Sequence, residues 1–178
     1  MADTLVWLVT LPLIGAVATL LLPRQANTIA SISAAATAVA AGFLVHAVYV
    51  HGALHYAIGG WHAGLGIALR ADGLSALLLL MTALVMLAAT VYAGAYYSTA
   101  GQRRQLWPLW LLLWTSLNAL LLAGDLFNLY VTLELLGLSA VTLACLGGKT
   151  AAIRAALRYL LVGLLGSMMF LAGVALVY

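Results

Sequence analysis

Glu134 is the residue in this sequence that most clearly could do chemistry. It lies in the stretch GDLFNLYVTLELLGLSAVTLACLGG, which runs from Gly124 to Gly148 and is otherwise almost entirely apolar after its first residues. Glu134 follows Leu126 by eight positions, so it lies roughly 12 Å into a helix that starts there. An acid near the bilayer centre costs about 2.5–3.5 kcal/mol on insertion scales and faces a protein interior or a water-filled cavity. A carboxyl group between a desolvating environment and a nearby cation can load and release a proton. We therefore interpret Glu134 as a proton relay or part of an ion path; the alternative is a structural glutamate held by a hydroxyl or an arginine.

Three basic residues are candidate electrostatic partners of Glu134: Lys149, Arg154 and Arg158. Arg154 and Arg158 are four positions apart and therefore share one helix face. Arg154 can extend its side chain to the membrane surface, whereas Arg158 lies roughly 10 Å inside. If the last two helices are packed neighbours, Arg158 could approach Glu134 directly or through water. We treat this coupling as a hypothesis.

Two aspartates, Asp72 and Asp125, stand immediately before apolar segments. An aspartate in that position can accept hydrogen bonds from free backbone N–H groups and interact favourably with the helix dipole. Both are interpreted as helix caps on the outer side, and a role in an ion-entry path is the alternative.

No cofactor or metal site is expected. His46, His51, His55 and His62 cluster in sequence, and His51 and His55 have metal-compatible spacing, but their surroundings resemble a loop and no carboxylate or cysteine is near. A haem- or quinone-binding redox subunit has little support. Cys145 is the single cysteine and is expected to be a packing residue. No phosphate loop, dinucleotide fingerprint or catalytic triad is evident, so the chain is expected to have no catalytic chemistry of its own.

Composition identifies the elements that must position these residues. Of the 178 residues, 66% are hydrophobic and 6% charged, against about 25% charged in soluble domains. The net charge of +3 is too small for a nucleic-acid partner. The chain is predicted to be an all-α polytopic membrane protein in a lipid bilayer.

Six segments are long and apolar enough to span the bilayer, namely residues 5–22, 28–50, 73–96, 106–123, 126–146 and 151–178. Residues 51–72 are glycine-rich and partly alternating, which predicts a short β-hairpin at the membrane surface.

Basic residues near the helix ends predict the orientation. Arg24, Arg103, Arg104, Lys149 and Arg154 lie in alternate connections, and of the other connections only residues 51–72 hold a basic residue, Arg70. Basic residues favour the cytoplasmic side. The N-terminus, the hairpin and the turn at Gly124-Asp125 are then expected outside a cell membrane.

The stretch GDLFNLYVTLELLGLSA resembles the fifth helix of the antiporter-like subunits shared by Mrp-type Na⁺/H⁺ antiporters, membrane-bound hydrogenases and complex I. The motif GDLFNLYV followed by Glu134 is most similar to the D-type subunits of Mrp antiporters and their hydrogenase relatives. GGWHAGLGIALRADGLSALLLLM resembles the outer hairpin and third helix of that family, and AAIRAALRYLLVGLLGSMMFLAGVALVY resembles its sixth helix.

The resemblance implies a proton-translocating membrane subunit in a larger complex. Protons, with or without Na⁺, would be carried, coupled to cation exchange or to redox chemistry in an NADH:quinone oxidoreductase-like or hydrogenase-like translocase. Glu134 would match the essential glutamate of the proton path, working with lysines of later helices. Arg158 stands where relatives commonly carry lysine, and arginine holds its proton too firmly to be a good carrier.

The resemblance also implies a division of the chain. Residues 1–105 would hold helices 1–3 and the hairpin at 51–72, and residues 106–178 would begin the proton-translocating repeat. Family subunits have about fourteen helices, so this chain would be the N-terminal part of a longer subunit or one piece of a split subunit. The alternative function is a non-transporting assembly subunit in which Glu134 only fixes helix packing.

Overall fold

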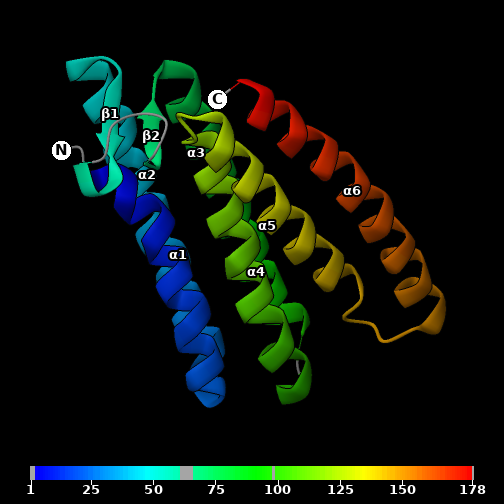
Figure 1. The fold of residues 1–178 in the computed structure, drawn as a ribbon. Helices are drawn as coiled ribbons and strands as arrows, with labels where there is room; N and C mark the ends of the chain where they lie inside the picture. The colour runs from blue at the N-terminus through cyan, green and yellow to red at the C-terminus, as the bar shows by residue number, and fades with distance from the viewer. Residues whose placement is uncertain (1–2, 61–65, 98, 178) are drawn as a thin grey trace.

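Six helices and one β-hairpin make up the part of the chain that the structure describes. The structure is a computed structural model that describes residues 3–60, 66–97 and 99–177. The helices are α1 (Asp3–Leu21), α2 (Ala26–His51), α3 (Gly73–Tyr96), α4 (Ala100–Leu121), α5 (Leu126–Ala144) and α6 (Thr150–Val177). The strands are β1 (Leu54–Ala57) and β2 (Ala68–Ala71), and two 3₁₀ turns, η1 (Pro23–Gln25) and η2 (Ile58–Gly60), join neighbouring elements. Figure 1 shows the helices side by side, with the hairpin at the end of the bundle where α1 begins.

These elements confirm the prediction of an all-helical, multi-pass membrane protein. The bounds of α3 are those expected, and the ends of α1, α2, α5 and α6 differ from expectation by at most two residues. The two strands pair antiparallel, with Leu54 opposite Ala71 and Ala57 opposite Ala68, so the predicted hairpin is present. By length and composition, all helices except α4 qualify as membrane spans in the described part of the chain.

The start of α4 was predicted wrongly. The helix begins at Ala100, six residues before the expected start, because Gln102, Arg103 and Arg104 are polar yet are good helix formers. The Arg103 guanidinium also ties this end of α4 to α3, since it donates to the carbonyl oxygens of Tyr97 and Gly94, the latter at 3.0 Å. The expected boundary at residue 105 therefore falls inside the first turns of α4.

Helix α4 is the centre of the bundle, which explains its weaker hydropathy. It packs along α1 and α5 and also contacts α2 and α3. Trp107, Leu111 and Trp114 are completely buried on it. A helix surrounded by other helices does not need a uniformly apolar surface, because a polar side chain such as Trp110 can bond to a neighbouring helix, here to the Thr90 hydroxyl of α3 at 2.9 Å.

A proline in α1 is matched by an asparagine in α4. Pro12 lies inside α1 and has no N–H to donate to the carbonyl of Leu8, one helical turn earlier. Asn118 of α4 supplies the missing donor: its Nδ2 group lies 2.7 Å from the Leu8 carbonyl oxygen. Both Leu8 and Asn118 are at most 1% exposed, so the carbonyl would otherwise be an unsatisfied acceptor in an apolar bundle.

Small residues let α1 and α2 approach closely. The Ser33 hydroxyl of α2 donates to the carbonyl of Leu11 in α1 at 3.2 Å. A Cβ atom on Gly15 would lie only 2.5 Å from the Ser33 Oγ atom, so the α1–α2 contact requires glycine there.

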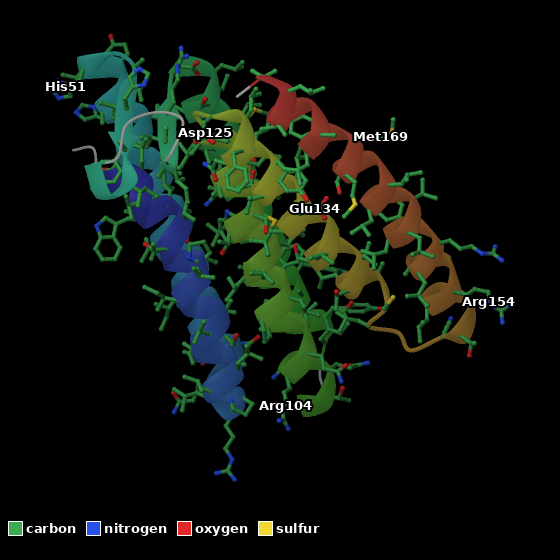
Figure 2. All side chains as sticks on the ribbon, viewed as in Figure 1. His51, Arg104, Asp125, Glu134, Arg154 and Met169 are labelled. Carbon is green, nitrogen blue, oxygen red and sulfur yellow. The ribbon has the colours of Figure 1, made fainter. Side chains whose placement is uncertain are left out.

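Most charged residues lie toward the two ends of the bundle. Figure 2 shows His51 and Asp125 at one end, Arg104 and Arg154 toward the other, and Glu134 between them. The end with Arg104 also holds Arg24 in η1 and Lys149 in the α5–α6 connection. This separation is the one expected from the basic residues of the sequence.

Candidate proton-transfer site

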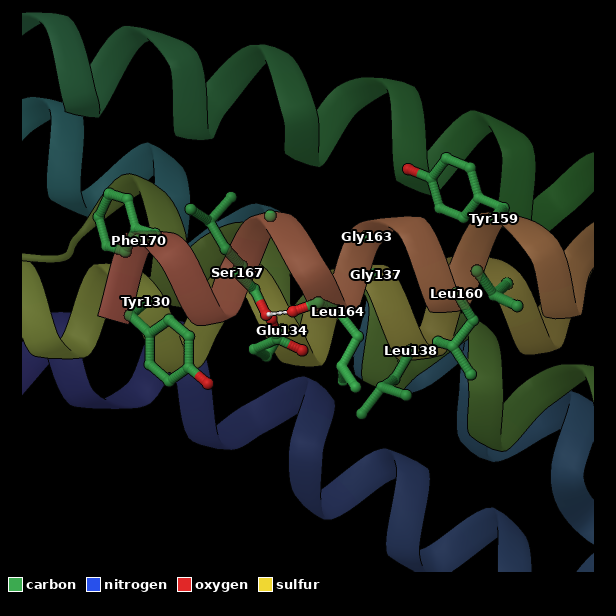
Figure 3. A pocket seen from close by; sticks show the side chains of 13 residues that line it. Tyr130, Glu134, Gly137, Leu138, Tyr159, Leu160, Gly163, Leu164, Ser167 and Phe170 are labelled. Carbon is green, nitrogen blue, oxygen red and sulfur yellow. Dashed lines mark hydrogen bonds between the residues drawn. The ribbon is translucent and has the colours of Figure 1, made fainter. Parts of the chain in front are cut away.

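Glu134 lies about halfway along α5 and faces α6. Its side chain is half-buried and lines a cavity of about 280 Å³ between the two helices. Figure 3 shows Glu134 and Ser167 pointing into this cavity from opposite helices. By volume the cavity has room for water, and Glu134 and Ser167 place polar groups on its wall to which water could bind. A carboxylate beside such a space can exchange protons with water instead of remaining isolated in lipid.

Glycines keep the space beside Glu134 open. Gly137 on α5 and Gly163 and Gly166 on α6 line the cavity. A Cβ atom built on any of the three would meet nothing within 4 Å. No close contact therefore requires glycine at these positions, and the missing side chains leave room in the cavity.

Two hydroxyl-bearing residues accompany Glu134. The Ser167 hydroxyl donates to the carbonyl of Leu164 in its own helix at 3.1 Å, which leaves its oxygen able to accept a further hydrogen bond. Tyr130 lies one turn before Glu134, and its ring stacks on Phe170 of α6 with centroids 6.3 Å apart. This stacked pair joins α5 to α6 at one end of the cavity.

The basic candidates do not meet Glu134 directly. Arg158 is exposed and is not part of the cavity wall. It precedes Ser167 by nine residues, or two and a half turns, so the two side chains leave opposite faces of α6. Within the described residues the ion pair found joins Arg70 to Asp72 at 3.8 Å, and none involves Glu134, Lys149, Arg154 or Arg158. An Arg158–Glu134 coupling therefore remains a hypothesis that requires water or another segment as intermediary.

The two aspartates are N-caps of α3 and α5. Asp72 accepts from the Ser75 N–H at 2.9 Å and from the Ser75 hydroxyl at 3.0 Å. The backbone hydrogen bond from Ser75 is the main cause that lowers the pKa of Asp72, followed by the Ser75 hydroxyl, with a smaller contribution from Arg70. Asp125 accepts from the Asn128 N–H at 2.7 Å.

The Asp125 end of α5 is joined to the hairpin. The Arg70 N–H donates to the Leu122 carbonyl and the Gly124 N–H to the Ala68 carbonyl, both at 2.8 Å. The Asp125 carboxylate in turn accepts from the Ala68 N–H at 2.9 Å. A Cβ on Gly124 would lie 3.0 Å from the Ala68 carbonyl oxygen, which explains the glycine before Asp125.

The histidines do not form a metal centre in the part of the chain that the structure describes, where no cluster of three or more metal-ligating side chains occurs. His46 lies on α2, His51 is the last residue of α2, and His55 is on β1. His62 lies outside the described residues.

Ser167 and Tyr130 line the cavity beside Glu134, and the sequence analysis did not place them there. In the sequence, Ser167 and Gly163 form a pair of small residues four apart, and such pairs usually mark helix contacts. Tyr130 precedes Glu134 by four positions, and that spacing on one helix face is the signal that could have identified it.

Comparisons with a family model and with known proteins agree on the same group of relatives. Residues 123–178 match the family described as "NADH:quinone oxidoreductase/Mrp antiporter, TM". The D-type subunit of the Na(+)/H(+) antiporter of Bacillus subtilis is 31% identical over 173 residues, covering 96% of this chain and 35% of that protein. The N-type subunit of the NADH-quinone oxidoreductase of Desulforudis audaxviator is 40% identical over 125 residues, covering 69% of this chain and 25% of that protein.

The fold agrees with the sequence comparison. A chain in the solved Mrp complex from Dietzia sp. DQ12-45-1b superposes with a TM-score of 0.87 at 29% identity, covering 99% of this chain and 34% of that chain. The chain thus spans about a third of the length of the relatives that it matches over nearly its whole length. By sequence and by fold, this protein is a homologue of the antiporter-like membrane subunits of Mrp antiporters and NADH:quinone oxidoreductases.

Proposed function

We propose that this chain is part of an antiporter-like subunit that carries protons across the membrane, with Glu134 as one of the proton-carrying groups. The observation that supports this most directly is the position of the Glu134 carboxylate on the wall of the α5–α6 cavity. A carboxylate in that position can take a proton from one water molecule and release it to another.

The chain supplies only some of the groups that a proton path needs. Ser167 provides a hydroxyl in the same cavity, and the glycines provide space for water. Arg158 is a poor proton carrier because a guanidinium remains charged at all accessible pH values. The remaining proton-carrying groups would come from other segments of the subunit or from neighbouring subunits.

The proposed partners are other membrane subunits of a multi-subunit complex. The solved relative is part of an Mrp complex, and the relatives include an antiporter subunit and a quinone oxidoreductase subunit. Proton movement would therefore be coupled either to the exchange of a monovalent cation or to electron transfer in a partner. The basic end of the bundle would face the cytoplasm, and the N-terminus and hairpin would lie outside the cell membrane.

The test is a Glu134→Gln substitution in the complete complex, reconstituted into vesicles. We expect the variant to assemble normally but to lose most proton transport, measured with a pH-sensitive dye. Thr132→Val is the matched control, because it is a similarly isosteric change on α5 at a residue that does not line the cavity. Normal assembly with wild-type transport in Glu134→Gln would contradict the proposal and favour a purely structural role.

A further inference from the structure

We infer that Asp125 is a positioning residue for Glu134, because its two carboxylate oxygens hold two different parts of the molecule. The Oδ1 atom accepts from the Asn128 N–H at 2.7 Å and so begins α5. The Oδ2 atom accepts from the Ala68 N–H at 2.9 Å, at the first residue of β2. One side chain thus starts the helix that bears Glu134 and fastens it to the hairpin. The inference rests on the proposed function of Glu134.

Backbone hydrogen bonds around Asp125 make this junction well defined. The α4–α5 turn lies along β2 as a short extension of the hairpin, with Leu69 bridging to Ala123. The Gly124 N–H donates to the carbonyl of Ala68, the same residue whose N–H Asp125 accepts. Ala68 is therefore held on both its donor and its acceptor, which fixes the start of α5 along its axis and in rotation.

At the opposite end of α5, the described part of the chain shows no hydrogen bond that joins this end to another element in the same way. The hydrogen bonds found for residues 145–149 remain within that turn and the adjoining helices, such as Gly148 N–H to the Cys145 carbonyl at 2.9 Å. Asp125 precedes Glu134 by nine residues, or about 14 Å along the helix. A shift or rotation at the Asp125 end would therefore displace the Glu134 carboxylate relative to Ser167 across the cavity.

Asp72 provides a natural contrast. It caps α3 as Asp125 caps α5, but a single oxygen, Oδ1, accepts both hydrogen bonds from Ser75. Its other oxygen faces the exposed Arg70 guanidinium at 3.8 Å. Among the residues that the structure describes, the Asp72 carboxylate therefore caps α3 and accepts no hydrogen bond from the backbone of another element.

Because different oxygens of Asp125 cap α5 and bind the Ala68 N–H, substitutions can separate these two interactions. Asparagine caps helices about as well as aspartate, but it has one acceptor and one donor group. Whichever way the amide turns, Ala68 or Asn128 loses its acceptor. Serine at this position can accept from the Asn128 N–H with its single oxygen, and it leaves the Ala68 N–H without an acceptor. Unlike asparagine, it does not place a side-chain NH₂ group against a backbone N–H.

The experiment compares Asp125→Asn, Asp125→Ser and the control Asp72→Asn in the complete complex in vesicles. Infrared titration would follow the Glu134 carboxyl band, identified by its loss in Glu134→Gln. Hydrogen exchange would follow the amide of Ala68. For both Asp125 variants we expect Ala68 exchange to rise about fivefold, the factor equivalent to a net hydrogen-bond contribution of about 1 kcal/mol. We also expect the infrared titration of the Glu134 carboxyl band to change, because the surroundings of the carboxyl group change. Asp72→Asn should change neither.

Three outcomes would overturn the inference. Unchanged Ala68 exchange would show that the hydrogen bond from Ala68 to Asp125 is not significant in the membrane. Raised exchange with an unchanged Glu134 titration would show that this hydrogen bond is only structural. An equal titration shift in Asp72→Asn would attribute the effect to the lost negative charge.

Additional variants keep the test decisive if Asp125→Asn fails to assemble. Asp125→Ser answers the same question, and Gly124→Ala disturbs the junction by contact with the Ala68 carbonyl instead of by hydrogen bonding. Failure of the proposed function is separately visible: Glu134→Gln would then transport protons normally, while the infrared band would still report the surroundings of the Glu134 carboxyl.

Discussion

At the scale of single residues, the structure predicts different effects on Glu134 for two candidate partners, Ser167 and Arg158. Ser167 shares the cavity with Glu134, whereas Arg158 leaves the opposite face of α6. We therefore expect Ser167→Ala to shift the Glu134 carboxyl band and its titration in infrared spectra more than Arg158→Ala does. A larger shift from Arg158→Ala would show that the arginine acts through water or another segment. Identical spectra for wild type and Arg158→Ala would exclude the coupling.

Asp72 allows a prediction about acid stability. Its pKa is lowered in the folded chain, chiefly by the Ser75 backbone N–H. Because the pKa is lower in the folded chain, the ionised carboxylate stabilises the fold at pH values above its ordinary pKa of about 3.9. This contribution to stability is lost as the pH falls through the lower pKa of the folded chain. We expect thermal unfolding to show that wild type exceeds Asp72→Asn in stability near neutral pH and that the difference shrinks below about pH 4. A difference that stays constant with pH would contradict this explanation.

At the scale of elements, the contact between α1 and α4 depends on a missing donor. The Leu8 carbonyl receives no N–H from Pro12 and is satisfied by Asn118, whose Oδ1 atom has no partner within the described residues. Asn118→Leu should therefore cost about 1–3 kcal/mol, the usual penalty for a buried group without its hydrogen bond. Unfolding of the complete subunit in mixed detergent micelles would measure it.

Pro12→Ala is the matched variant for Asn118→Leu. Alanine restores the N–H inside α1, so the double variant should lose less stability than the sum of the two single variants, by roughly 0.5 kcal/mol or more. Strict additivity would show that Asn118 stabilises the bundle by some means other than the Leu8 carbonyl.

The helices could be predicted from the sequence more fully than the contacts between them. Long apolar segments identified each helix, and alternation identified the hairpin, because both signals are local. The early start of α4 was missed because Arg103 looked like a connection residue, and only its contacts with the end of α3 show otherwise. The contacts Asn118–Leu8 and Asp125–Ala68 join positions 110 and 57 residues apart. No periodic pattern encodes which helices become neighbours, so such contacts required the structure.

At the scale of the whole molecule, the charge separation predicts an orientation that can be measured. His55 in the hairpin and Gln102 at the start of α4 are both exposed. In a Cys145→Ser background, we expect a membrane-impermeant maleimide to label His55→Cys on intact cells and Gln102→Cys only after permeabilisation, because basic residues favour the cytoplasmic side. The reverse pattern would contradict the proposed orientation.

The bond between Asn118 and the Leu8 carbonyl also has a consequence for biogenesis. The donor is encoded 110 residues after the acceptor, and ribosomes add about 5–20 residues per second. On the order of ten seconds therefore pass after α1 is made before α4 is available. During that interval the proline-interrupted turn of α1 must be solvated by water or by the insertion machinery. The Leu8 carbonyl thus gains its Asn118 donor only when α4 arrives, so a chain arrested on the ribosome before residue 118 would hold a first helix that is still incompletely hydrogen-bonded.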